Sequence, residues 1–177
     1  MLILRELTYD DLKNLNSMRN DTDIVSQLVS PFRFVNYETD RKWFESYMSS
    51  RNQNVRCVLC DNAEQSIPLA YAGLLDIDSI SRSALFYIQI AREHQGKKYG
   101  TAATNLILQH GFNNLNLNRI ELTVLEYNER AINLYEKTGF KKEGIKREAV
   151  YKNGKYENLV FMSILKNEFY VKPTMGV

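Results

Sequence analysis

The sequence is poor in the residues that cross-link or interrupt a chain. Its 177 residues include two cysteines, three prolines and eight glycines. Two cysteines are too few for a disulfide scaffold, and the absence of low-complexity tracts argues against a flexible linker. No run of about 18 apolar residues occurs, which argues against a membrane-spanning helix. We therefore expect one globular domain over residues 1–170, followed by a tail at 171–177.

An excess of one charge is also missing. Lys and Arg number 23 and Asp and Glu number 21, so the formal net charge is +2. A surplus this small argues against nucleic acid or an anionic membrane surface as the partner. Charge already appears at Arg5 and Glu6, before any apolar stretch of the length of a secretion signal. We therefore expect a cytoplasmic protein.

Cys57 and Cys60 lie in an apolar run that is typical of a strand. Residues three apart on a strand face opposite sides of the sheet, which disfavours a disulfide bond or a shared metal ion. His94 and His110 are isolated and complete no zinc-ligand set. We expect structural cysteines and no metal site.

The sequence does have enough apolar residues for a sizeable core, since 44% of it is hydrophobic and 11% aromatic. Hydrophobic periodicity and turn residues predict helices at 9–19, 37–50, 99–114 and 128–138. They predict strands at 2–7, 54–60, 68–77, 83–91, 119–125, 140–148 and 156–165, with Asn153-Gly154 as a hairpin turn. This order indicates an α/β protein with a single mixed sheet of about seven strands flanked by about four helices.

A glycine-bounded loop joins the strand predicted at 83–91 to the helix predicted at 99–114. The unpaired N–H groups and partial positive charge of a helix start can bind a phosphate or pyrophosphate. The spacing matches neither a P-loop nor a dinucleotide fingerprint. From these residues alone, an anion cradle and a plain turn with two solvated lysines are equal alternatives. The loop consists of Gln95, Gly96, Lys97, Lys98, Tyr99, Gly100 and Thr101.

A second pattern lies on the helix predicted at 128–138. Asn128, Ala131 and Tyr135 follow one another at i, i+3 and i+7, so they share one stripe of the helix. A polar group and a phenol could therefore face one ligand. In the alternative interpretation Asn128 is only the N-cap and Tyr135 a core residue, and this segment alone favours that alternative.

Together the two segments resemble the GNAT superfamily of N-acetyltransferases, which transfer the acetyl group of acetyl-CoA to amines. The loop from Gln95 to Gly100 is similar to the Gln/Arg-x-x-Gly-x-Gly/Ala loop that binds the CoA pyrophosphate in that family. Residues 128–140 match the family pattern Asn-x-x-Ala-x-x-Leu-Tyr-x-x-x-Gly-Phe at every stated position. The resemblance covers about residues 1–170 and implies a mostly antiparallel sheet with the GNAT-like acyl-CoA N-acyltransferase fold.

The resemblance also implies roles for individual residues. The fourth and fifth strands splay apart in this family, and a fourth-strand backbone N–H supports the acetyl carbonyl. Tyr135 would act on the CoA sulfur as hydrogen-bond donor or general acid, and Asn128 would contact the pantetheine arm. The cofactor-binding residues implied are Ile88, Gln89, Ile90, Gln95, Gly96, Lys97, Lys98, Tyr99, Gly100, Thr101, Asn128, Ala131 and Tyr135.

The sequence determines the amine acceptor less closely than the cofactor. Residues 147–158 look like the branch that holds ribosomal-protein N-terminal, polyamine and nucleotide-amino-sugar acetyltransferases. Arg19-Asn20 before an acidic residue resembles the amino-sugar enzymes, although an Arg at a helix C-terminus with a capping Asn is the alternative. A protein N-terminus is equally open. The acceptor-binding residues implied are Arg19, Asn20, Phe32 and Tyr87, and a polyamine would instead use Asp21, Asp23, Glu38 and Asp40.

Two positions depart from the family pattern. Lys98 stands where glycine is usual, and the cradle is kept if Lys98 has right-handed helical angles. Leu85 stands where many members of the branch carry a Glu assigned to base catalysis, so we name no general base. The departures leave a CoA-binding regulatory or interaction module without turnover as the alternative function. Exposed sheet edges in this fold also leave a homodimer open.

Overall fold

The computed structural model describes residues 1–61 and 67–171. The strands are β1 (Leu2–Glu6), β2 (Val55–Asp61), β3 (Ala70–Asp78), β4 (Ser83–Ile90), β5 (Arg119–Leu125), β6 (Lys141–Lys152) and β7 (Lys155–Leu165). The helices are α1 (Leu12–Arg19), α2 (Thr22–Ser26), α3 (Tyr37–Ser49), α4 (Tyr99–Gln109), α5 (Glu129–Thr138) and α6 (Lys166–Val171). Short 3₁₀ turns at Tyr9–Asp11 and Arg92–His94 precede α1 and α4, and a π-helical turn at His110–Asn114 extends α4.

Every strand and helix predicted from the sequence is present, with ends shifted by a few residues. Helices α2 and α6 were not predicted, because segments of five and six residues are too short to show a helical period. Helix α6 covers residues assigned to the end of the domain and the start of the tail. The rest of that predicted tail, residues 172–177, lies outside the described residues.

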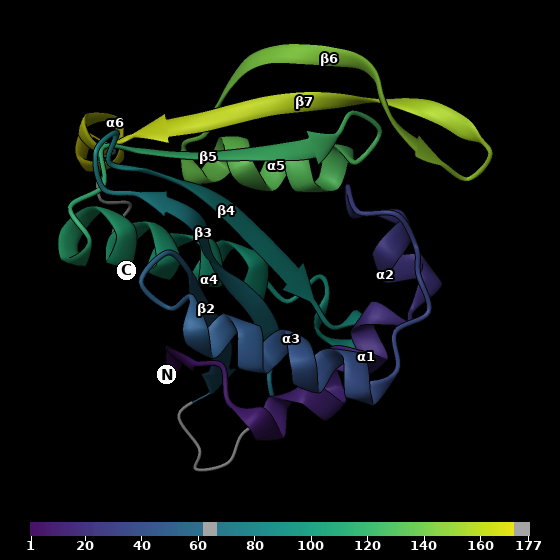
Figure 1. Ribbon diagram of the computed structural model, residues 1–177. Coiled ribbons are helices and arrows are strands. Elements are labelled where there is room, and N and C mark those ends of the chain that lie inside the picture. Colours follow the sequence, from purple (N-terminus) through teal and green to yellow (C-terminus); the bar gives the residue numbers. More distant parts are fainter. Residues whose placement is uncertain (62–66, 172–177) are drawn as a thin grey trace.

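The strands form one mixed sheet in the order β1-β2-β3-β4-β5-β7-β6 (Figure 1). Among the described residues, β4 and β5 pair in parallel and each other neighbouring pair is antiparallel, as expected for the GNAT fold. The parallel pair is where the chain crosses over through α4. Strands β1 and β6 are the outer edges, and their pairing with a second copy stays a prediction.

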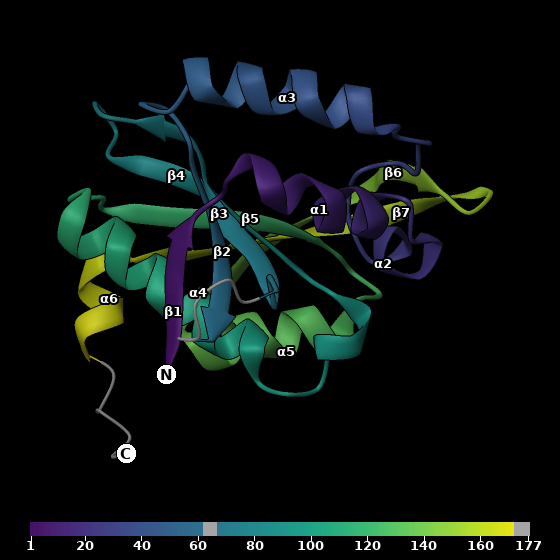
Figure 2. The same cartoon turned by 90° about the horizontal axis from the view of Figure 1, so that it is seen from below.

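Helices cover both faces of the sheet (Figure 2). Side chains of α4 and α5, such as Ile107 and Ile132, form one core with the sheet, and side chains of α1, such as Leu15, form a second core on the other face. Cys60 belongs to the second core and Cys57 packs against the first, as the strand pattern predicts. No helix in the described part of the chain is long and apolar enough to span a membrane.

The helix ends are set by the residues that the sequence indicates. The Asp11 carboxylate accepts a hydrogen bond from the backbone N–H of Thr8 at 2.8 Å, which closes the start of the α1 segment. Asn36 caps α3 by accepting from the N–H of Thr39 at 2.9 Å. Gly139 ends α5 in the left-handed conformation, at φ 104°.

Gly73 makes room for a stack of rings and guanidinium groups beneath α3. Arg56 of β2, Gly73 of β3 and Tyr87 of β4 occupy one row across the sheet. The guanidinium carbon of Arg56 lies 5.5 Å from the Tyr87 ring centroid and 4.7 Å from that of Trp43 on α3. Such cation–π contacts hold α3 against the sheet. They are possible because the residue between Arg56 and Tyr87 has no side chain.

Gly73→Ala should therefore destabilise the protein. A Cβ at residue 73 would lie 2.0 Å from the Val55 carbonyl oxygen and 2.7 Å from Cε1 of Tyr87, so backbone and ring must both move. We expect the free energy of unfolding to fall by about 2–3 kcal/mol in urea denaturation. Gly144→Ala is the matched control, because nothing lies within 4 Å of its Cβ. Equal stability of the two variants would contradict this reading of Gly73.

Candidate active site

The central feature of the site is an opening between β4 and β5. The two strands pair only at Ser83↔Arg119, Ala84↔Ile120 and Leu85↔Glu121. Beyond these pairs β4 continues to Ile90 and β5 to Leu125 without pairing with each other, and Figure 1 shows them diverging. Residues 88–90 of β4 pair with β3 on one side and face the opening on the other. Backbone groups on that side of the strand are available to a ligand. This geometry agrees with the splay that the family resemblance implies.

The loop that follows β4 has the geometry of an anion cradle. Gly96 has φ +80° and Lys98 has φ +64°, after which α4 begins at Tyr99. No side chain caps the start of α4, and the first hydrogen bond within the helix is donated by the N–H of Ala102 to the carbonyl of Lys98. The preceding N–H groups of the first turn, through Thr101, are therefore free of helical partners. An unpaired helix start of this kind is suited to the pyrophosphate of CoA.

The right-handed conformation considered for Lys98 is wrong. Its φ of 64° and ψ of 7° place it in the left-handed region. The turn from extended Gln95 into α4 uses left-handed angles at residues 96 and 98, and the chain adopts them with a lysine where the family has glycine. The left-handed conformation costs a non-glycine residue about 1–2 kcal/mol. The loop thus adopts left-handed angles at Lys98 at the expense of stability.

Neighbouring side chains brace this loop. Gln95 donates from Nε2 to the Ile90 carbonyl at 3.4 Å and accepts from Arg130 of α5 at 2.8 Å, so it links the end of β4 to α5. A Cβ at Gly100 would lie 2.5 Å from Leu134 and 2.9 Å from Ile90. Gly100 therefore serves the packing of α4 against α5 and β4. Lys97 and Lys98 are exposed beside the helix start, and neither has an ion-pair partner among the described residues.

Tyr135 lies directly beneath the opening. Its ring contacts Phe86 edge to face, with centroids 6.1 Å apart, and Phe86 is the first residue of β4 beyond the stretch paired with β5. The side chain is 9% exposed, and no described residue bonds its hydroxyl. Burial raises the pKa of Tyr135 to about 12, so the phenol is protonated at neutral pH. A buried phenol without a protein partner is free to donate to a ligand.

Asn128 and Ala131 form the start of α5. The Asn128 side chain accepts from the N–H of Ala131 at 3.1 Å, so it is the N-cap, and it donates from Nδ2 to the Gln27 carbonyl at 3.0 Å. Both polar atoms of the side chain are thus used within the protein. The N-cap interpretation describes this residue, and its contact with the pantetheine arm stays a prediction. Ala131 is partly buried against the core beside Tyr135.

Residues 22–30, which we call the bridging segment, connect the two diverging strand ends. Asp23 pairs at 2.7 Å with Arg92, just after β4, and the Ser26 carbonyl accepts at 2.5 Å from the hydroxyl of Tyr127, just after β5. Lys152 of the final hairpin donates to the carbonyls of Val25 at 2.8 Å, Leu28 at 2.5 Å and Ser30 at 2.8 Å. Sequence reasoning missed these contacts, since they join residues far apart in the chain and leave no local pattern.

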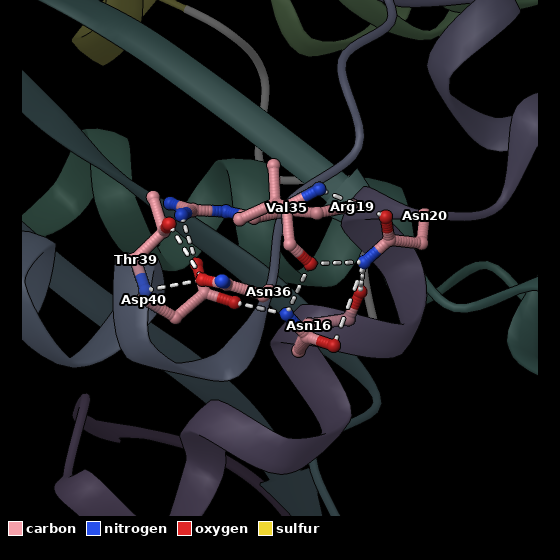
Figure 3. A network of polar contacts seen from close by, with 7 residues as sticks. All are labelled: Asn16, Arg19, Asn20, Val35, Asn36, Thr39 and Asp40. Carbon is pink, nitrogen blue, oxygen red and sulfur yellow. Dashed lines mark hydrogen bonds and ion pairs between the residues drawn. The ribbon is translucent and has the colours of Figure 1, made fainter.

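Three of the residues implied for the acceptor, Arg19, Asn20 and Asp40, are held by polar contacts within the protein (Figure 3). Asp40 is fully buried between Arg19, with which it forms an ion pair, and Asn16, which donates to it at 2.6 Å. Asn20 ends α1 and fixes the backbone of Val35 by donating to its carbonyl at 2.7 Å and accepting from its N–H at 3.0 Å. The alternative of a C-terminal Arg with a capping Asn thus describes what these side chains do.

The other implied acceptor residues are dispersed. Phe32 is exposed in the connection before α3, and Tyr87 lies in the Arg56 stack described above. Asp21 caps α2 and Glu38 pairs with Arg41 on the surface at 3.3 Å. With Asp23 and Asp40 also paired, all four carboxylates proposed for a polyamine have partners within the protein. No cluster of three or more potential metal ligands occurs in the described part of the chain.

Comparison with known proteins places this geometry in a family. A model of the acetyltransferase (GNAT) domain matches residues 1–141. The chain belongs to the GNAT acetyltransferase family. As a GNAT protein it is an acetyl-CoA-dependent N-acetyltransferase, and nothing supports the alternative of a module without turnover.

Relatives of this GNAT chain include two spermidine N(1)-acetyltransferases. The Vibrio cholerae enzyme is 34% identical over 140 residues, which are 78% of each chain. The Escherichia coli K12 enzyme is 29% identical over 167 residues, 94% of this chain and 87% of the relative. A crystal structure of spermidine N-acetyltransferase from Vibrio cholerae in complex with CoA and spermine superposes with a TM-score of 0.89 at 32% identity, covering 96% of this chain and 98% of that one.

Lys98→Gly should stabilise the protein. Glycine removes the left-handed penalty at φ 64° but adds flexibility to the unfolded chain, so we expect a gain of about 0.5–1 kcal/mol in the free energy of unfolding. Urea denaturation measures it. Gly96→Ala, with φ 80° and no neighbour within 4 Å of its Cβ, is the reciprocal control and should lose about 1 kcal/mol. Lower stability of Lys98→Gly would contradict the strain at this residue.

Proposed function

We propose that this protein transfers the acetyl group of acetyl-CoA to a primary amine of a polyamine. The observation that carries the proposal is the similarity over 96% of the chain to a structure that binds both CoA and spermine, together with the β4–β5 opening. Sequence identity of 34% and 29% to two spermidine N(1)-acetyltransferases, over most of the chain, supports the same acceptor.

The cofactor side of the site is built from the β4 end, the loop and α4. The free N–H groups at the start of α4 would hold the pyrophosphate, with the ammonium groups of Lys97 and Lys98 beside it. The uncapped helix start and the two lysines without partners match the negative charge of that group. When bound, acetyl-CoA supplies the activated acetyl group. Residues 88–90 would offer the backbone N–H that polarises its carbonyl oxygen.

Tyr135 would donate a hydrogen bond to the leaving sulfur at the end of the reaction. Attack by a neutral amine displaces a thiolate, which needs a hydrogen-bond donor. The Tyr135 hydroxyl is protonated at neutral pH because burial raises its pKa to about 12, and it has no partner among the described residues. Its place beside Phe86 brings it to the point where β4 leaves β5. We therefore assign Tyr135 as donor to the leaving sulfur.

Tyr135→Phe should lower turnover and leave cofactor binding intact. The variant removes one hydroxyl and keeps the ring that packs on Phe86 and Phe140. We expect kcat to fall about 100-fold, with the KM for acetyl-CoA within about twofold of the parent value. Release of free thiol from CoA, followed at saturating amine, measures both. Unchanged kcat would remove Tyr135 from the chemistry.

The function itself is tested by ligand binding and by turnover with spermidine. Acetyl-CoA at 100 times its Kd should add about 2.7 kcal/mol to the free energy of unfolding, and ATP and NADPH should add much less. Thiol release should then require both acetyl-CoA and spermidine. Stabilisation by acetyl-CoA without turnover of spermidine would keep the cofactor and reject the polyamine. No stabilisation by acetyl-CoA would reject the whole proposal.

A further inference from the structure

Residue 85 of β4 carries no carboxylate, but the residue beside it on β5 does. Leu85 of β4 is 38% exposed and is paired in register with Glu121 of β5. Ile120 and Leu122 point into the core shared with α4 and α5, so Glu121 faces the opposite side of the sheet. Leu85 faces that side too, because Ala84 and Phe86 belong to the same core. Adjacent strands lie about 4.8 Å apart, which brings a Glu121 carboxylate close to where the branch usually has one.

Glu121, Glu143 and the Arg119 that bonds both of them form a group with one more carboxylate than guanidinium. Arg119 donates from Nε to Oε2 of Glu121 at 2.7 Å and through both terminal nitrogens to Glu143. The Arg119 fork and the Ser163 hydroxyl lower the pKa of Glu143 to about 2, so Glu143 is ionised at neutral pH. One guanidinium thus serves two carboxylates. Oε1 of Glu121 accepts no hydrogen bond from any residue that the structure describes.

The position of Glu121 relative to the opening suits the far end of an acceptor. Residues 88–90, which would hold the acetyl carbonyl, begin three residues beyond Leu85, or about 10 Å along β4. Glu121 is therefore too far away to contact the reacting nitrogen. The surface beside it is apolar, since Leu85 and Phe161 on this face are 38% and 40% exposed. A methylene chain that ends in a second ammonium group would match both features.

We propose that Glu121 binds the second ammonium group of the acceptor and so selects diamines and polyamines over monoamines. This assignment rests on the proposed function. Glu121 is a specificity-determining residue in this scheme and does not take part in proton transfer. Its carboxylate comes from β5, beside residue 85 of β4, and its role differs from the base catalysis that the family resemblance implies for a Glu at residue 85. Leu85 then supports the methylene chain between the two nitrogens.

Glu121→Gln should weaken the use of spermidine specifically. The change removes the charge and keeps the shape, so we expect kcat/KM for spermidine to fall about tenfold, mainly through KM. The kcat/KM for propylamine and the KM for acetyl-CoA should not change. Glu45→Gln is the matched control, because Glu45 lies exposed on α3 and its carboxylate has no hydrogen bond or ion pair in the described chain. Equal losses for spermidine and propylamine, or no loss at all, would overturn the assignment.

Leu85→Glu tests the same idea by moving the carboxylate. In the Glu121→Gln background it should restore much of the lost spermidine selectivity, and on its own it should lower the KM for spermidine. This second variant decides the question if Glu121→Gln folds poorly. A Leu85→Glu variant that neither restores nor gains selectivity would contradict the assignment.

Failure of the inference is distinct from failure of the proposed function. A parent protein that acetylates spermidine while Glu121→Gln does so with the same KM leaves the function standing and removes Glu121 from it. A parent that neither acetylates spermidine nor binds it by calorimetry in the presence of CoA removes both. Retained selectivity for spermidine over propylamine in Glu121→Gln would also count against Glu121.

Discussion

The early end of the β4–β5 pairing is the constraint on which the rest of the molecule depends. Three residue pairs hold the strands together, and each strand then continues with one side unpaired. Unpaired backbone groups of a protein need a partner, which water or a ligand can supply. Tyr135 lies beneath this point through Phe86, and the bridging segment crosses from the end of β4 to the end of β5. The features of the site are thus consequences of one interruption in the sheet.

Charge divides the two sides of the opening. On the cofactor side, exposed Lys97 and Lys98 and the uncapped start of α4 all present positive charge without a protein partner. On the opposite face of the sheet, where β4 and β5 are still paired, one guanidinium, that of Arg119, is shared between the carboxylates of Glu121 and Glu143. An anionic cofactor and a cationic acceptor would each meet a complementary surface. The overall charge of +2 hides this separation.

The sequence was informative where structure follows from short-range patterns. Strand and helix periods, the Asn36 and Gly139 caps and the 128–140 motif were sufficient for the fold and the family. Long-range contacts were beyond such patterns. Lys152 reaching three carbonyls in the bridging segment depends on the complete fold, and the place of Glu121 beside Leu85 depends on the register of two distant strands.

The remaining differences between the sequence predictions and the structure have two causes. One is backbone conformation, and the other is bonding of side chains to partners within the protein. The residues around Lys98 do not predict its left-handed backbone angles, because lysine does not favour that conformation. Asp21, Asp23, Glu38 and Asp40 looked available in the sequence because ion pairs and caps are invisible until the partners are placed. In the structure each of these carboxylates has a partner within the protein, and their part in an acceptor site stays a prediction.

The bridging segment has a consequence for solubility. Because β4 and β5 separate, the sheet has two inner edges in addition to the outer edges β1 and β6. Unpaired edges are templates for pairing with strands of other molecules. The bridging segment is tied to both sides of the gap through Arg92 and Tyr127, and to the hairpin through Lys152. Loosening these ties would expose the inner edges, so aggregation during expression is the natural failure of variants in this segment.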